Sequence, residues 1–213
     1  GETTFGGRTE LIDPTGIVDY GSLMFMALER STSAREAIKI IADLVEEYGY
    51  GSDGETFSIS DANEVWYMEI IGKGYTPIYD KKLNDTINSD KGAVWVAIRI
   101  PDGYVSGHAN AARITTFPWN DPENCKYAPD VADVARKFGW FNGEDKDFSF
   151  AEAYAPADFS ALRGCEARVW AFFRTVADDM DQYEDYAMGH NPNNRMPLWV
   201  MPREKVSPKL LMD

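Results

Sequence analysis

The chain has 213 residues, of which 44% are hydrophobic and 13% aromatic, so it can bury a sizeable core and is not a disordered polypeptide. Its formal net charge is −14 at pH 7, and no cluster of Lys and Arg provides the basic patch that a nucleic-acid partner requires. No apolar run is long enough to span a membrane, and the N-terminal residues lack the features of a signal peptide. We therefore expect neither a nucleic-acid partner nor a membrane partner.

The first part of the chain predicts two successive amphipathic helices. Apolar residues recur at helical spacing over 18–30, and again over a run that begins after Ser33 and stops near Tyr48 and Gly49. Ser33 and Glu36 have the spacing of a capping box, which predicts the start of the second helix. Gly49 can adopt the left-handed conformation that ends a helix. Each helix has one apolar face and needs a layer to pack against.

Three strands supply that layer, and they are predicted over Glu55–Ser60, Glu64–Ile71 and Ala93–Ile100. Bulky residues point in both directions along them, which indicates a sheet that is covered on both faces. Short links favour antiparallel pairing, and the polar residues 73–91 predict an excursion between paired strands. Glu69 and Arg99 interrupt the apolar strands, and we expect a cross-strand ion pair between them rather than a catalytic role.

After Phe117 the pattern changes to loops and helices. A short helix is predicted over 129–138, further helices over 148–154 and 162–178, and a loop punctuated by prolines over 191–208. The order of helices, antiparallel sheet and helices predicts an α+β fold. We expect a single domain, with helices and an antiparallel sheet over 1–117 and a helical, loop-rich part over 118–213.

Few side chains with catalytic chemistry stand out. No metal, phosphate or dinucleotide motif is present, so the sequence predicts no metal and no cofactor. Cys125 and Cys165 lack metal-ligand spacing and are best interpreted as ordinary free thiols, although a single disulfide remains open. Of the two histidines, His108 and His190, the first is favoured as a hydrogen-bonded loop residue, and a Cys/His dyad that uses it is the weaker alternative. The acidic residues over 178–185 indicate a solvated helix end rather than a metal site.

Asn110 is the polar residue with the most interesting position. It follows the third predicted strand, where a side-chain amide can donate a hydrogen bond to a developing oxyanion. Asparagine is also a common turn residue, so the pattern by itself leaves both interpretations open.

Several strings resemble the dipeptidase A group of cysteine-type peptidases, which belong to the N-terminal-nucleophile hydrolase superfamily. They span nearly the whole chain and comprise Glu2–Arg8, Ser33–Ala37, Tyr48–Tyr50, Gly54–Asp61, Asn63–Glu69, Trp95–Asp102, His108–Ile114, Pro197–Val200 and Val206–Pro208. The resemblance implies an αββα sandwich and the hydrolysis of dipeptides with broad specificity, so that a dipeptide is the expected substrate. It also implies a nucleophilic N-terminal cysteine, freed by processing, whose own α-amino group is the base.

Asn110 matches a family position near that cysteine, and the resemblance implies that it binds the oxyanion or positions the nucleophile. The chain departs from the family because it begins with Gly1, and because neither Cys125 nor Cys165 occupies the nucleophile position. Since the match reaches both ends, we expect an internal portion of a larger dipeptidase that lacks the nucleophile and is inactive alone. The alternative is a diverged, truncated relative that acts as an association or binding module, in which open sheet edges would favour a homo-oligomer.

Overall fold

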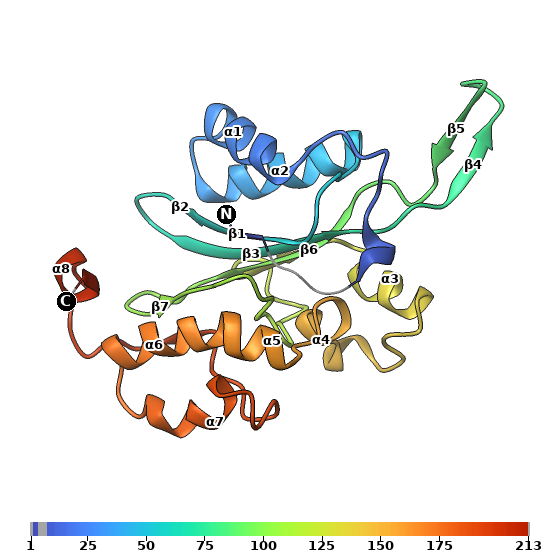
Figure 1. The fold of residues 1–213 in the computed structure, drawn as a ribbon. Helices are drawn as coiled ribbons and strands as arrows, with labels where there is room; N and C mark the ends of the chain where they lie inside the picture. Colours follow the sequence, from blue (N-terminus) through green and yellow to red (C-terminus); the bar gives the residue numbers. More distant parts are fainter. Residues whose placement is uncertain (1, 4–7, 213) are drawn as a thin grey trace.

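A five-stranded antiparallel sheet forms the centre of this computed structural model, which describes residues 2–3 and 8–212 (Figure 1). The strand order is β1-β2-β3-β6-β8. The strands are β1 (Glu2–Thr3), β2 (Glu55–Ser60), β3 (Val65–Gly72), β6 (Ala93–Arg99) and β8 (Cys125–Tyr127). Each of the neighbouring pairs is antiparallel, and the three predicted strands are confirmed to within about a residue at each end. The sequence did not reveal β1 and β8, which are only 2 and 3 residues long.

Two helices, α1 (Tyr20–Arg30) and α2 (Ala34–Tyr48), cover one face of this sheet, as predicted (Figure 1). Ser33 accepts a hydrogen bond from the backbone N–H of Glu36 at 3.2 Å, which caps α2. The carboxylate of Glu36 accepts a hydrogen bond from the backbone N–H of Thr32 at 2.7 Å. In the expected capping box this donor would be the N–H of Ser33, so the second hydrogen bond of the box is shifted by one residue. Gly49 ends α2 with φ of 74°, the left-handed region in which glycine carries no penalty.

Alternation along β3 divides the core between the two faces of the sheet. Trp66 and Met68 are fully buried against α1 and α2, whereas Tyr67 and Ile71 pack into the core on the opposite face. Burying a side chain of this size contributes about 2 kcal/mol relative to leaving it exposed. The expectation of a sheet covered on both faces is confirmed, and so is the α+β class.

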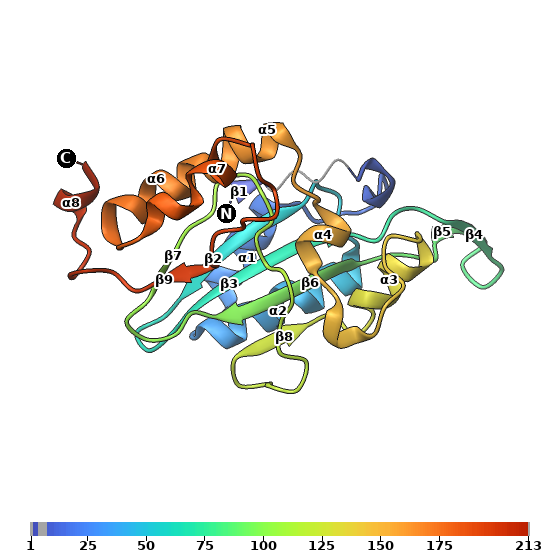
Figure 2. The same ribbon diagram turned by 90° about the horizontal axis from the view of Figure 1, so that it is seen from below.

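Short helices cover the second face (Figures 1 and 2). They are α3 (Val131–Lys137), α4 (Phe150–Tyr154), α5 (Phe159–Ala161) and α6 (Ala167–Val176). The helix α7 (Glu184–Ala187) lies on the side of α6 away from the sheet, and α8 (Pro208–Met212) lies at the edge of the fold (Figure 1). The long helix predicted over 162–178 is regular only from Ala167, because Leu162–Glu166 forms a π-helical turn between α5 and α6. Wider turns of this kind are common near functional sites.

Residues 73–91 form the predicted excursion, and it contains a hairpin of β4 (Pro77–Asp80) and β5 (Asp85–Asn88) that projects from the body of the fold (Figure 1). The buried side chain of Asn88 holds the base of the hairpin. Its Nδ2 donates to Oδ2 of Asp13 and to the carbonyl oxygen of Gly74, both at 2.8 Å.

A second, two-stranded ladder pairs β7 (Val105–Ser106) with β9 (Trp199–Val200) below the main sheet and close to α6 (Figures 1 and 2). Val105 and Val200 pack into the same apolar cluster as Val169 and Phe173 of α6. The region 191–208, predicted as loop, therefore contains a strand. This ladder fixes the first end, at Ser106, of the segment that carries the candidate site.

Candidate active site

The segment from Ser106 to Ile114 contains Asn110 and is anchored to the main sheet by a buried carboxylate. Glu69 of β3 accepts the backbone N–H of Arg113 at 2.5 Å and that of Ile114 at 3.2 Å. Burial raises the pKa of the Glu69 carboxyl to about 7, although the two N–H donors favour its charged form. At the other end, Oγ of Ser106 donates to the carbonyl oxygen of Leu198 at 2.6 Å, which reinforces the β7–β9 ladder.

The expected ion pair between Glu69 and Arg99 is wrong. In the register of β3 and β6, Glu69 lies opposite Val96, so the two charged residues do not face each other. The guanidinium of Arg99 instead contacts carboxylate oxygens of Glu64 at 3.4 Å and Asp102 at 2.7 Å. Glu69 therefore holds the loop backbone rather than a charged side chain of the next strand.

A buried ion pair joins the same loop to the helical layer. Nε of Arg113 lies 3.0 Å from Oε1 of Glu166, and the two side chains are only 2% and 4% exposed. Arg113 also donates to the carbonyl oxygens of Gly107 at 3.0 Å and Pro197 at 2.9 Å, and Glu166 accepts from the Tyr186 hydroxyl at 3.2 Å. Because so many donors of Arg113 are satisfied, the desolvation of the pair is well compensated, and the pair ties the loop to the helical layer.

Asn110 lies at the outer part of this anchored loop. It is half-buried, and its φ of 60° is in the left-handed region that asparagine tolerates better than most residues. Nη2 of Arg168, on α6, donates to Oδ1 of Asn110 at 2.8 Å and to the carbonyl oxygen of Ala109 at 3.0 Å. The amide oxygen of Asn110 therefore faces the guanidinium of Arg168. The NH2 group, which is a hydrogen-bond donor, is at the other end of the amide.

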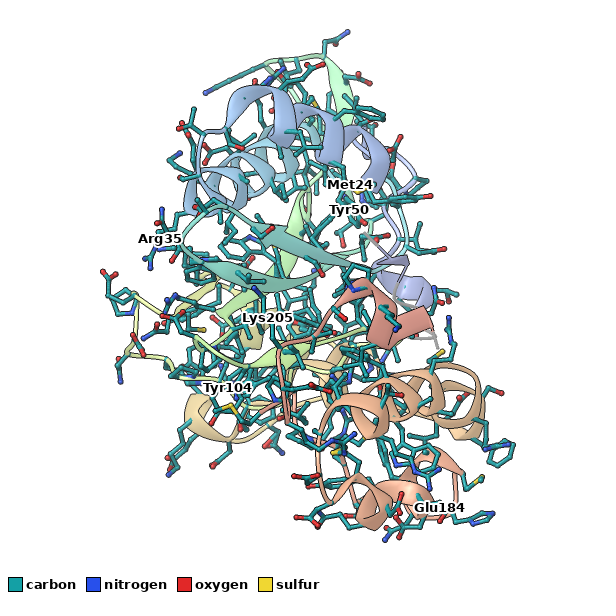
Figure 3. The ribbon with its side chains drawn as sticks, turned by 90° about the vertical axis from the view of Figure 1, so that its left-hand side faces the viewer. Met24, Arg35, Tyr50, Tyr104, Glu184 and Lys205 are labelled. Carbon is teal, nitrogen blue, oxygen red and sulfur yellow. The ribbon has the colours of Figure 1, made fainter. Side chains whose placement is uncertain are left out.

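His108 is a hydrogen-bonded loop residue, as the sequence favoured. Its Nε2 lies 3.0 Å from Oγ of Ser58 on β2, and its ring meets that of Tyr67 edge-on with centroids 5.5 Å apart. A cavity of about 260 Å³ lies beside it, between β2, β3 and β7, and Ser58, Tyr67, Tyr104, Ser106 and Phe172 are among the residues that line it. Figure 3 shows Tyr104 on the side of the sheet opposite to Met24 of α1, which is the side of the anchored loop.

The two cysteines are free thiols, so no disulfide joins them. Cys125 lies on β8, whereas His108 contacts Ser58 on β2. The strands β3 and β6 lie between β2 and β8, which are therefore about 14 Å apart at the usual strand spacing. Burial raises the pKa of its thiol to about 12, so the reactive thiolate is scarce at neutral pH. Cys165 lies in the partly exposed π-helical turn. A dyad of His108 with Cys125 is therefore contradicted by the geometry.

Sequence reasoning missed Arg168 and Glu166, which hold the loop from the helical layer. They lie 58 and 53 residues from their partners Asn110 and Arg113, and nothing local in the sequence marks such distant contacts. Within residues 2–3 and 8–212, no three His, Cys, Asp or Glu side chains gather in a way that could hold a metal ion. In that same part of the chain, no helix is both long and apolar enough to cross a bilayer.

Comparison with known proteins identifies the class of protein that carries this fold and loop. The sequence profile of peptidase family C69 matches residues 1–210, and the chain belongs to this family. The resemblance to the dipeptidase A group of cysteine-type peptidases is thereby confirmed.

Three relatives show how much of a longer protein this chain represents. It is 26% identical to a probable dipeptidase from Salmonella dublin over 211 residues, which is 97% of this chain and 42% of that protein. It is 26% identical to a probable dipeptidase from Latilactobacillus sakei over 161 residues, which is 76% of this chain and 30% of that protein. It is 27% identical to probable dipeptidase B from Streptococcus pyogenes serotype M3 over 157 residues, which is 72% of this chain and 27% of that protein. The chain thus spans less than half the length of these relatives.

Proposed function

We propose that this chain is part of a cysteine-type dipeptidase, and that the nucleophilic cysteine is supplied by residues outside this chain. Membership of peptidase family C69 supports a peptide substrate, and the relatives' description as probable dipeptidases supports a dipeptide. The observation that carries the proposal for these residues is the contact between Arg168 and Asn110 on a loop anchored by Glu69 and Arg113.

In this proposal Asn110 stabilises the charge that develops on the substrate. The cysteine thiolate bonds to the carbonyl carbon of the dipeptide, and the carbonyl oxygen becomes an oxyanion. The NH2 group of Asn110 donates a hydrogen bond to that oxygen, because Arg168 holds the other end of the amide. The α-amino group of the cysteine takes the thiol proton and gives it to the leaving amine as the carbon–nitrogen bond breaks. Water then hydrolyses the thioester, which releases the acid and regenerates the thiol.

We also propose that the chain forms a single domain and contributes to an αββα sandwich. The layer order supports this: α1 and α2, then the five-stranded sheet, then the β7–β9 ladder, then α6 (Figure 1). Among the described residues β7 and β9 are the only strands that form a layer below the main sheet, so further strands of a second sheet would come from outside this chain.

The test is the replacement Asn110→Ala in the whole protein, assayed with dipeptides. Loss of one oxyanion donor should lower kcat by roughly 10²- to 10³-fold, with a smaller change in KM. The matched control is Asn63→Ala, at an exposed turn between β2 and β3, which should leave both constants unchanged. An unchanged kcat for Asn110→Ala in a folded protein would remove Asn110 from the reaction. A whole protein that hydrolyses no dipeptide would instead favour the alternative of a binding module.

A further inference from the structure

Strand β2 is paired along its full length on one side and along only part of its length on the other. All of Glu55–Ser60 pair with β3, whereas β1 pairs only with Glu55 and Thr56. Among the described residues, no strand therefore pairs with the outer edge of Phe57–Ser60. Unpaired N–H and C=O groups of a strand edge are a template for another strand.

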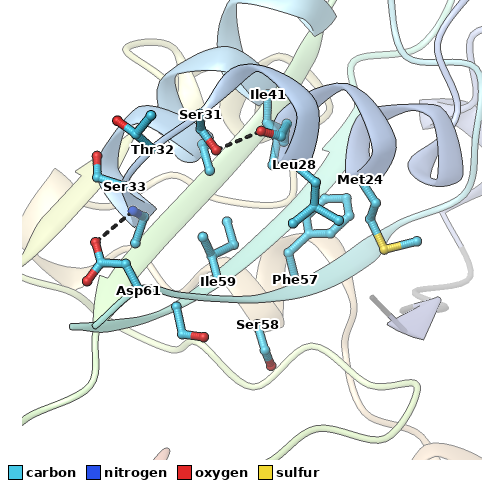
Figure 4. Close-up of a pocket in the computed structure, with 14 residues that line it drawn as sticks. Met24, Leu28, Ser31, Thr32, Ser33, Ile41, Phe57, Ser58, Ile59 and Asp61 are labelled. Carbon is cyan, nitrogen blue, oxygen red and sulfur yellow. Dashed lines mark hydrogen bonds between the residues drawn. The ribbon is translucent and has the colours of Figure 1, made fainter. Parts of the chain in front are cut away.

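An apolar groove of about 360 Å³ runs beside this open edge (Figure 4). Phe57 and Ile59 form its floor, and Met24 and Leu28 of α1 form a wall. Leu28 is 79% exposed, although it lies on a helix that packs on the sheet. Met24, on the same helix, is half-buried. Exposed apolar side chains that line a groove next to an open edge indicate a surface that another segment covers.

The register of β1 identifies the segment. Glu2 lies opposite Thr56 and Thr3 lies opposite Glu55, so each earlier residue of this antiparallel strand meets a later residue of β2. We propose that, in the whole protein, the residues that directly precede Glu2 extend β1 along Phe57–Ser60 and fill the groove under α1. The relative from Salmonella dublin is matched over only 42% of its length, so it contains chain outside the matched region.

The same register predicts which side chains of the added strand are buried. Residues directly opposite each other in an antiparallel pair point to the same face of the sheet. The residue three positions before Glu2 meets Ile59, so its side chain enters the groove against Met24 and Leu28 and should be apolar. The residue two positions before Glu2 meets Ser58, on the face that carries His108. Pairing of this segment with β2 does not depend on dipeptide hydrolysis.

Hydrogen exchange of the whole protein at single-amide resolution tests the added pairing. The amides of Phe57–Ser60 that point away from β3 should exchange at least about 100-fold more slowly than exposed amides. The outward amides of β4, on the projecting hairpin, are the matched control and should exchange fast. Equally fast exchange of the outward amides of β2 would overturn the inference.

Oxidative cross-linking of the whole protein identifies the occupant. A cysteine three positions before Glu2 should form an intramolecular disulfide with Ile59→Cys, because the two face each other. A cysteine two positions before Glu2 should not, because its side chain points to the other face of the sheet. Cross-linking in both variants or in neither, or a disulfide between two molecules, would contradict extension of β1 by this segment.

Discussion

The guanidinium of Arg168 lies 2.8 Å from the side-chain oxygen of Asn110, although 58 residues separate them in the sequence. Arg168 is an exposed residue of α6, yet it contacts both the backbone before Asn110 and the Asn110 amide. The orientation of the candidate oxyanion donor is thus set by a different layer of the fold. Arg168 is a positioning residue in this account, and its effect should depend on Asn110.

Replacing Arg168 by alanine in the whole protein should lower kcat roughly 10- to 100-fold, because the Asn110 amide loses its fixed orientation. In the Asn110→Ala background the same replacement should have little further effect, which a merely structural role would not produce. The control is Arg174→Ala on the same helix, where the ion pair with Asp181 is exposed and activity should not change. Equal losses from Arg168→Ala in both backgrounds would contradict the positioning role.

Replacing Glu166 by alanine should destabilise the protein by about 3–5 kcal/mol, because it leaves the buried Arg113 guanidinium without its counter-charge. Urea unfolding of the variant and the parent protein measures this difference. Lys39→Ala, which removes an exposed pair with Asp43, should change the free energy of unfolding by less than about 0.5 kcal/mol. A loss at Glu166 no larger than that of the control would show that the pair does not hold the loop.

Stability should depend on pH through Glu69 with a definite sign. The pKa of Glu69 is about 7 in the folded chain and near its ordinary value of 4.5 in the unfolded chain. Between pH 4.5 and 7 the folded chain therefore holds a proton on Glu69 that the unfolded chain has lost. The stabilisation is complete below pH 4.5 and is lost as pH rises through 7, by on the order of 3 kcal/mol. Glu69→Gln cannot titrate, so unfolding measured from pH 4 to 8 should show the parent losing stability relative to this variant. A difference that stays constant with pH would contradict the buried state of Glu69.

Carboxyl groups whose pKa is lowered by folding change the stability in the opposite direction as pH changes. Hydrogen bonds from Arg35 lower the pKa of Glu64, and those from Asn194 and Asn191 lower the pKa of Asp185. Their stabilising effect is lost as pH falls. Because both groups are present in the parent and in Glu69→Gln, the comparison of the two proteins isolates the contribution of Glu69.

The elements that sequence patterns predicted best are those whose signals are local. The helical spacing of apolar residues in α2, its cap at Ser33 and its end at Gly49 all lie within one short stretch. The alternation along β3 likewise predicted that both faces of the sheet are buried. These features depend on neighbours a few residues away, so they can be read without knowledge of the tertiary structure.

The features that the sequence did not predict are those that depend on distant contacts. The partner of Glu69 could not be derived because strand register decides which side chains face each other, and that register is set by the whole sheet. The sequence pattern singled out Asn110 but left its role open between a turn residue and an oxyanion donor. Its contact with Arg168 comes from a helix in another layer and could not be predicted. The short strand β8, with the buried Cys125, lacks the length that alternation requires.

The most direct test of the central claim is dipeptide hydrolysis by the whole protein that carries both Cys125→Ala and Cys165→Ala. If the nucleophile lies outside this chain, the double variant should retain the activity of the parent, while the 213-residue chain alone should hydrolyse no dipeptide. Loss of activity in a folded double variant, or hydrolysis by the isolated chain that disappears when either cysteine is replaced, would contradict the account.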